Sequence, residues 1–93
     1  MYATIRSYSG GSDFADALID HENDVRQVIT QIGGFRAYYL LRTSDGAATI
    51  SVFDDQSGAE ESTRAAAAWV ADNLADLSVS PPQVTTGEVA VSF

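Results

Sequence analysis

The only histidine of the chain, His21, lies on a predicted helix, seven residues after Phe14 and four before Val25. This spacing places it on or beside the apolar stripe of that helix. An imidazole ionises close to neutral pH, so His21 could act as a general base or sense the protonation of a ligand. The alternative is a structural histidine at the edge of the core, hydrogen-bonded to the backbone.

The only tryptophan, Trp69, lies on a second predicted helix among small residues, with Ala65 and Ala66 before it and Ala68 beside it. Small neighbours leave volume next to an aromatic face, which is a typical setting for a planar ligand. The same residues would also let the helix pack closely on a sheet, with Trp69 filling the core. In the first interpretation, Ala65 and Ala66 line a pocket beside Trp69.

Tyr38 and Tyr39 are adjacent on a predicted strand, so their side chains point to opposite faces of the sheet. At most one of them can line a pocket beneath the helices, and the other would lie at an interface. Tyr39 shares a face with Phe35 and Ala37, but the pattern does not decide which face meets the helices. The tyrosine inside the pocket would donate a hydrogen bond to a ligand.

Other polar groups give weaker signals for chemistry. Arg36 and Arg42 could bind an acidic ligand or serve an interface, because they share a strand face with large apolar residues. We interpret residues 9–12 as a loop, since they lack the signatures of a phosphate-binding loop, and Asp54-Asp55 as an acidic lead-in to a helix. With no cysteine and no second histidine, we expect neither a metal site nor a cofactor.

The first half of the chain predicts a strand, a helix and a hairpin. Mixed β-branched, aromatic and polar residues indicate a strand over 2–8. Ser12 is a suitable N-cap, and apolar residues then recur at helical spacing over 13–32, until Gly33-Gly34 ends the pattern. Two strands, 35–43 and 47–53, follow around an Asp45-Gly46 turn signal.

The second half predicts a helix and a last strand. Ser57 and Glu60 form a capping-box pattern, and the apolar stripe that follows extends to Leu77. Two prolines then exclude helix, and the final strand extends from Val84 to Phe93, with a bulge or kink at Gly87. The order βαββαβ predicts an α+β, ferredoxin-like fold with a four-stranded antiparallel sheet.

The net negative charge of the chain argues against nucleic acids and anionic membranes as partners. Of 93 residues, 13 are acidic and five are basic, which gives a formal net charge of -8. Such a chain lacks the positive surface that nucleic acids and anionic membranes require. No apolar run is long enough to span a bilayer, and the N-terminus does not resemble a secretory signal, so we expect a cytoplasmic protein.

All five cations are arginine, and lysine is absent. Together with the acidic excess, this favours adaptation to high salt, because dissolved salt screens the self-repulsion of an acidic surface. A thermal stability that does not change between low and molar KCl would contradict this hypothesis.

The predicted sheet has one face that the helices leave bare. In a monomer that face should be polar, yet both faces of 35–43 carry large apolar groups. A small domain of this kind gains core by closing its bare face against a second copy. We therefore expect a homodimer, with a pairing of Arg6 and Glu88 on the bare face.

Three segments resemble the antibiotic biosynthesis monooxygenase-like domains of the dimeric α+β barrel superfamily. They are Gly34-Phe35-Arg36-Ala37-Tyr38-Tyr39, the hairpin end Ile50-Ser51-Val52-Phe53-Asp54, and residues 61–70 around Trp69. The resemblance covers essentially the whole chain in element order, as one domain over 1–93. It implies a homodimeric barrel of two sheets with helices outside and a pocket between sheet and helices in each copy.

The resembled family includes cofactor-independent monooxygenases of polycyclic phenols, haem-degrading enzymes and members with no known activity. By resemblance, Trp69 occupies the position of the second-helix tryptophan of the active enzymes. The monooxygenases carry an asparagine one turn earlier, where this chain has Ala65. The haem-degrading members carry an asparagine on the first strand, where this chain has Ser7 or Ser9, and a histidine after the tryptophan, which is lacking here.

We predict a small-molecule-binding homodimer, with cofactor-independent monooxygenation of an aromatic, phenolic substrate as the reaction to test. In that reaction His21 would be the base, Trp69 a wall of the pocket and Tyr39 a hydrogen-bond donor. The other predicted lining residues are Ala65, Ala66 and Tyr38. Two alternatives stay open: a structural or regulatory homodimer without a substrate, and haem binding with His21 as the sole candidate for an axial ligand.

Overall fold

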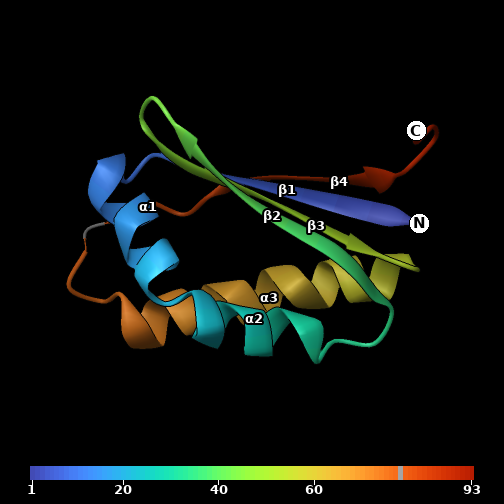
Figure 1. The fold of residues 1–93 in the computed structure, drawn as a ribbon, viewed down its shortest axis with the longest axis horizontal. Coiled ribbons are helices and arrows are strands. Elements are labelled where there is room, and N and C mark those ends of the chain that lie inside the picture. The colour runs from blue at the N-terminus through green and yellow to red at the C-terminus, as the bar shows by residue number, and fades with distance from the viewer. Residues whose placement is uncertain (78) are drawn as a thin grey trace.

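A four-stranded antiparallel sheet forms one layer of the molecule, and three helices form the other (Figure 1). The computed structural model describes residues 1–77 and 79–93. Its strands lie in the order β2-β3-β1-β4. The elements along the chain are β1 (Tyr2–Tyr8), α1 (Gly11–Asp20), α2 (Glu22–Thr30), β2 (Phe35–Thr43), β3 (Gly46–Phe53), α3 (Gln56–Asn73) and β4 (Gln83–Glu88).

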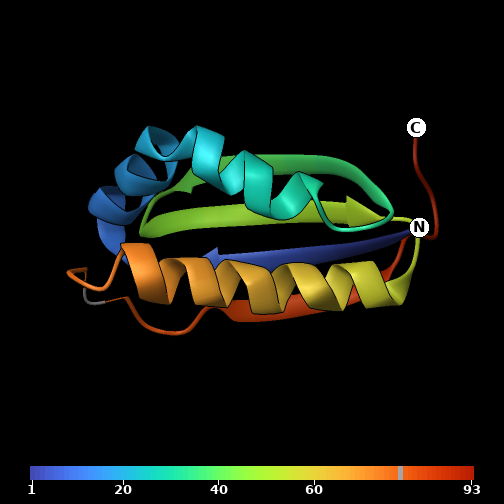
Figure 2. The same ribbon diagram turned by 90° about the horizontal axis from the view of Figure 1, so that it is seen from below.

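All three helices cover the same face of the sheet (Figures 1 and 2). β1 pairs with β3 on one side and with β4 on the other, so that Ile5 lies opposite both Ile50 and Thr85. The predicted α+β, ferredoxin-like arrangement is therefore confirmed. The periodicity of the chain determines it, because alternating strands and amphipathic helices can bury their apolar sides only by stacking sheet on helix.

The single helix predicted over 13–32 is wrong, because it is two helices. α1 ends at Asp20 and α2 begins at Glu22, with His21 between them at φ -101° and ψ 26°. The apolar stripe has a gap at this point, since His21 replaces the apolar residue that a continuous stripe would need. α1 also begins at Gly11, so the predicted N-cap at Ser12 is wrong as well.

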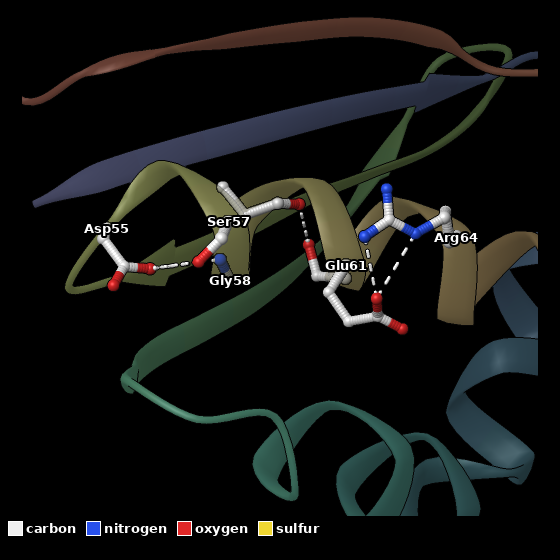
Figure 3. Close-up of polar contacts among 7 residues, drawn as sticks. Asp55, Ser57, Gly58, Glu61 and Arg64 are labelled. Carbon is white, nitrogen blue, oxygen red and sulfur yellow. Dashed lines mark hydrogen bonds and ion pairs between the residues drawn. The ribbon is translucent and has the colours of Figure 1, made fainter.

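The start of α3 also differs from the expected capping box at Ser57. Asp55 is the N-cap, and its Oδ1 accepts hydrogen bonds from the Gly58 amide (3.2 Å) and the Ser57 hydroxyl (2.9 Å) (Figure 3). These two bonds lower the pKa of the Asp55 carboxyl. The Asp55 side chain therefore satisfies one free amide of the first turn, that of Gly58, which confirms the acidic lead-in to this helix.

Two strand boundaries are corrected. The hairpin pairs Thr43 with Gly46, so its turn residues are Ser44 and Asp45. Gly46 belongs to the strand, where a Cβ atom would lie 2.1 Å from the Tyr8 carbonyl oxygen. A side chain therefore cannot be accommodated at this position.

β4 is shorter than the predicted last strand, since it ends at Glu88. Gly87 pairs with Ala3 in regular register, and the sheet irregularity instead lies between Phe35 and Ala37. The residues after β4 turn away from the helices toward the bare side of the sheet (Figure 1). Val89 is half-buried, and residues 90–93 are exposed, including Val91 at 70%.

The apolar core lies between the sheet and the helices in two clusters. One is at the α1 end, and its buried members are Tyr8, Phe14, Ala15, Leu18, Ala47 and Leu74. The other is at the opposite end and contains Ile29, Phe53 and Ala59. In the described part of the chain, no helix combines the length and the apolar character needed to cross a bilayer.

Candidate functional site

The middle of the helix-covered sheet face, between the two apolar clusters, is polar. Its buried polar side chains are Thr4, Arg6, Thr49, Ser51 and Ser62, the last contributed by α3. Arg6 is 1% exposed. This placement overturns the predicted Arg6–Glu88 pair, because Arg6 points toward the helices and lies opposite Val84, whereas Glu88 lies opposite Tyr2.

Hydroxyl groups surround the Arg6 guanidinium. Its Nε donates to the hydroxyl of Thr49 (3.1 Å), and its Nη2 donates to Ser51 (2.7 Å). Its Nη1 donates to two residues of α3, Ser62 (3.0 Å) and Thr63 (3.2 Å). The guanidinium therefore ties the centre of the sheet to α3 through four neutral acceptors.

Burial changes the ionisation of the groups around this centre. Desolvation lowers the pKa of Arg6, although the hydroxyls of Tyr8 and Tyr38 act in the opposite direction. Burial raises the pKa of Tyr8, and it raises the pKa of Tyr38 to about 12, against the influence of the Arg6 charge. Both tyrosines are consequently neutral phenols at physiological pH, able to donate a hydrogen bond.

A small cavity lies directly against Arg6. Its volume is about 20 Å³, and its wall includes Arg6, Tyr38, Thr49, Ala66 and Trp69. This is room for one water-sized group. The cavity therefore contains the predicted tryptophan and one of the two predicted tyrosines, but it is much smaller than a ligand pocket.

A surface groove of about 450 Å³ lies beside this cavity, between α2 and β2. Four side chains border both spaces, namely Leu18, Val25, Ile29 and Tyr38. The groove and the cavity are therefore neighbours with a partly shared lining. A volume of this size, with mostly apolar walls, is within the range of small-molecule sites.

His21 lies next to Trp69 but does not line either space. The two rings are in a T-shaped contact with 5.4 Å between their centroids. Nδ1 of His21 lies 3.3 Å from a carboxylate oxygen of Asp24, and the His21 side chain is 42% exposed. The structure therefore brings His21 and Trp69 together at the junction of α1 and α2, outside the described lining of the cavity.

The two tyrosines lie on opposite faces, as predicted, and the structure decides which one is inside. Tyr38 lines the cavity, whereas Tyr39 is 59% exposed on the bare face. Within one protomer the sheet separates Tyr39 from Trp69, so of the two tyrosines only Tyr38 lies beside Trp69. Ala66 lines the cavity as expected, but Ala65 is not among its described lining residues.

The arginines predicted as acid-binding candidates are engaged on the surface. Arg36 pairs with Asp54, and Arg42 pairs with Asp16 at 2.7 Å. All four of these side chains are more than half exposed. They form intramolecular surface ion pairs, and neither arginine lines the groove or the cavity.

The prediction from sequence missed Arg6 as a site residue. A signal for it exists in the alternation of β1, where Thr4, Arg6 and Tyr8 share one face. A cation between residues that carry hydroxyl groups on a strand is typical of a buried polar centre, provided that their face is the covered one.

Neither a protein-family model nor a curated protein matches this sequence. Solved structures do match. A candidate antibiotic biosynthesis monooxygenase from Nitrosomonas europaea has a TM-score of 0.72 and 17% identity, over 98% of this chain and 100% of that one. A monooxygenase from the gene ActVA-Orf6 of Streptomyces coelicolor, in complex with nanaomycin D, has a TM-score of 0.70 and 15% identity, over 99% and 88%.

A third match is a variant of MhuD with two manganese protoporphyrin IX molecules bound per active site. It has a TM-score of 0.75 and 14% identity, over 100% of this chain and 98% of that one. At such low identity the likeness concerns the arrangement of the backbone. The chain therefore has the fold of the antibiotic biosynthesis monooxygenase-like proteins.

Proposed function

We propose that this protein is a homodimer that binds a small aromatic molecule between α2 and β2 of each copy. One observation carries this proposal: the groove of about 450 Å³ shares Leu18, Val25, Ile29 and Tyr38 with the cavity that contains Trp69. An aromatic ring in the groove would contact apolar side chains, while the buried polar centre would recognise its substituent.

The solved structures with this fold support an aromatic ligand. One holds nanaomycin D and another holds manganese protoporphyrin IX. A cofactor-independent oxygenation of a phenol is the reaction we propose to test. In such a reaction the phenol loses its proton, the ring is oxidised by O₂, one oxygen atom becomes a second carbonyl, and the other leaves as water. His21, the predicted base, contacts Trp69 but is not among the described lining residues of the cavity or the groove, so as a base it would have to reach the phenol through an intervening water.

The bare sheet face supports the homodimer. Ile5, Tyr39 and Leu41 are 42%, 59% and 44% exposed, and Ile50 lies between Ile5 and Tyr39 in the register. Exposed apolar groups in one contiguous patch favour a protein interface. Since the patch lies on the sheet face that no helix covers, the same face of a second copy would cover it.

The fluorescence of Trp69 provides the test of binding, because it is the only tryptophan. We expect saturable quenching by naphthol or a hydroxynaphthoquinone in the micromolar range. The variant Val25→Phe fills the groove and should abolish quenching. The matched control Asn23→Phe places the same ring on the exposed side of α2 and should leave quenching unchanged. Circular dichroism verifies that both variants fold.

The small volume of the cavity favours a second candidate, a homodimer without a ligand. A volume of about 20 Å³ holds a single water-sized group, so an aromatic ring does not fit in the cavity itself. Absence of quenching across the panel, with a dimeric mass in solution, would favour this candidate. Haemin belongs in the same panel: a Soret band that disappears in His21→Ala would instead support haem binding.

A further inference from the structure

The five arginines of the chain fall into two groups. Four are exposed, and each pairs with a carboxylate: Arg26 with Glu22, Arg36 with Asp54, Arg42 with Asp16, and Arg64 with Glu61. Arg6 is the buried one, and its hydrogen bonds go only to hydroxyl groups. Among residues 1–77 and 79–93, no carboxylate forms an ion pair with it.

This arrangement is the reverse of what electrostatics favours. Exposed ion pairs contribute little, whereas a buried cation without a countercharge is costly. Hydroxyl groups satisfy the N–H donors of Arg6 but do not neutralise its charge. The chain has 13 acidic residues, so carboxylates are not scarce. The centre of the sheet therefore holds a positive charge whose partner would have to come from outside the protomer.

The cavity against Arg6 has the size of that missing partner. About 20 Å³ accommodates one oxygen atom, and the wall beside it carries the neutral phenol of Tyr38. The groove on the other side of Leu18, Val25, Ile29 and Tyr38 accommodates a ring. Of the four side chains that border both spaces, Leu18 and Ile29 are buried core residues, whereas Val25 and Tyr38 are only partly buried.

We propose that Arg6 is the anion-binding group of this protein and that its ligand is an aromatic acid. The ring lies in the groove between α2 and β2, and an anionic oxygen of a phenolate or carboxylate occupies the cavity against the guanidinium. Tyr38 donates a second hydrogen bond to the same oxygen. This inference rests on the proposed function, since it names the class of molecule that the groove binds.

The charge of Arg6 has a chemical consequence for a phenolic ligand. A fixed cation beside the hydroxyl favours the ionised form, so the O–H bond breaks at lower pH and the proton leaves to solvent. The bound phenol would then be an electron-rich anion at neutral pH without a base in contact with it. This agrees with the position of His21, which lies outside the described lining of the cavity.

Two probes of equal shape separate binding from anion recognition: naphthoate, which is an anion, and naphthamide, which is neutral. In calorimetric titrations of the full chain we expect naphthoate to bind roughly 10- to 100-fold more tightly. In Arg6→Gln, which keeps an amide donor toward the hydroxyls, this preference should disappear while naphthamide binding persists. The matched control Arg64→Gln makes the same charge change on the outer side of α3 and should retain the preference.

Para-nitrophenol gives a second readout, because its ionisation is visible in its absorbance. Bound to the wild type, its pKa should fall by about one unit or more. In Arg6→Gln the bound and free values should coincide. If Arg6→Gln does not fold, the wild-type preference for naphthoate decides the matter alone, and Arg6→Lys, which keeps the charge but loses the planar fork, should retain part of it.

The outcomes separate the two proposals. Equal affinity of the wild type for naphthoate and naphthamide would overturn the role of Arg6 and leave the proposed function intact. A preference for naphthoate that survives in folded Arg6→Gln would likewise overturn it. If neither probe binds, the proposed function fails, and the inference about Arg6 fails with it.

Discussion

At the centre of the sheet the covered face is polar and the bare face is apolar, and β3 shows this residue by residue. Toward the helices it carries Thr49 and Ser51, which are at most 3% exposed. Toward the bare side it carries Ile50 and Val52 in alternation with them. The covered face is thus polar at its centre, whereas the uncovered face is apolar.

This reversal suggests that the single chain is not the complete functional unit. Folding normally buries apolar groups and leaves charged groups in water. Here the bare face would gain stability from a second copy, and the buried cation would gain it from an anion. The two faces therefore point to two different partners, and each can be tested by changing one face while the other is kept intact.

The largest effect is expected at Phe53, which is fully buried and packs edge to face on Phe35 with 5.9 Å between ring centroids. Phe53→Ala should lower the free energy of unfolding by about 3–5 kcal/mol, because it leaves a cavity between sheet and helices. Val52→Ala, one residue earlier on the opposite face, should act mainly on dimer stability. Urea unfolding over a range of protein concentrations measures both effects. A larger loss for Val52→Ala than for Phe53→Ala would contradict the assignment of the two faces.

A charge on the bare face should break the dimer. Ile50→Asp places a carboxylate at the centre of that face, and we expect the dissociation constant to rise at least about 100-fold, or roughly 3 kcal/mol. Light scattering should then give the 9.9 kDa mass of the single chain. Ala68→Asp, on an exposed position of α3, is the matched control and should remain dimeric. A wild-type protein that is monomeric at every concentration would rule out the dimer.

The buried tyrosines of the covered face should make the free energy of unfolding depend on pH at high pH. Burial raises the pKa of Tyr38 to about 12 in the folded protein, above the value of about 10 in the unfolded chain. Between these two values the unfolded chain has lost a proton that the folded protein retains, so stability falls as pH rises, by about 1.4 kcal/mol per pH unit. Tyr38→Phe should reduce this slope, and Tyr8 should supply what remains, since burial raises its pKa too. Unfolding midpoints measured across this window test the prediction, and an identical slope in Tyr38→Phe would contradict it.

The smallest effect is expected for the surface arginines. Arg64 and Glu61 pair at 2.8 Å on the outer side of α3, where both are at least half exposed (Figure 3). Removing the pair by Arg64→Ala should change the free energy of unfolding by at most about 0.5 kcal/mol, since water and salt screen it. Thermal unfolding in low and high salt measures this change. A loss above 2 kcal/mol would mean that surface ion pairs, and not the core, carry the stability.

The order of the elements was predictable because it depends on local patterns. The alternation over β1 and the helical spacing around Trp69 are properties of short segments, and each pattern indicates one type of secondary structure. Boundaries were less predictable. Asp55 and Ser57 are both good caps, and which one is used depends on how the chain leaves β3, so α3 begins earlier than the capping-box pattern indicated.

The candidate site was predicted in part. Trp69, Ala66 and Tyr38 do line one cavity, as their types and spacing indicated. Arg6 was assigned to the wrong face, and Tyr39 was given a role that the sheet prevents it from having within one protomer. The reason is the same for both residues: strand alternation divides side chains into two sets, but it does not state which set the helices cover.

The local spacing of residue types was thus sufficient to predict the strands, the helices and the division of each strand into two faces. Only the tertiary structure decided which face is inside, because burial depends on contacts between residues far apart in sequence. Arg6 donates its hydrogen bonds to hydroxyl groups of β3 and α3, more than forty positions away. No pattern near Arg6 contains that information, since it arises when three separate elements meet around one guanidinium.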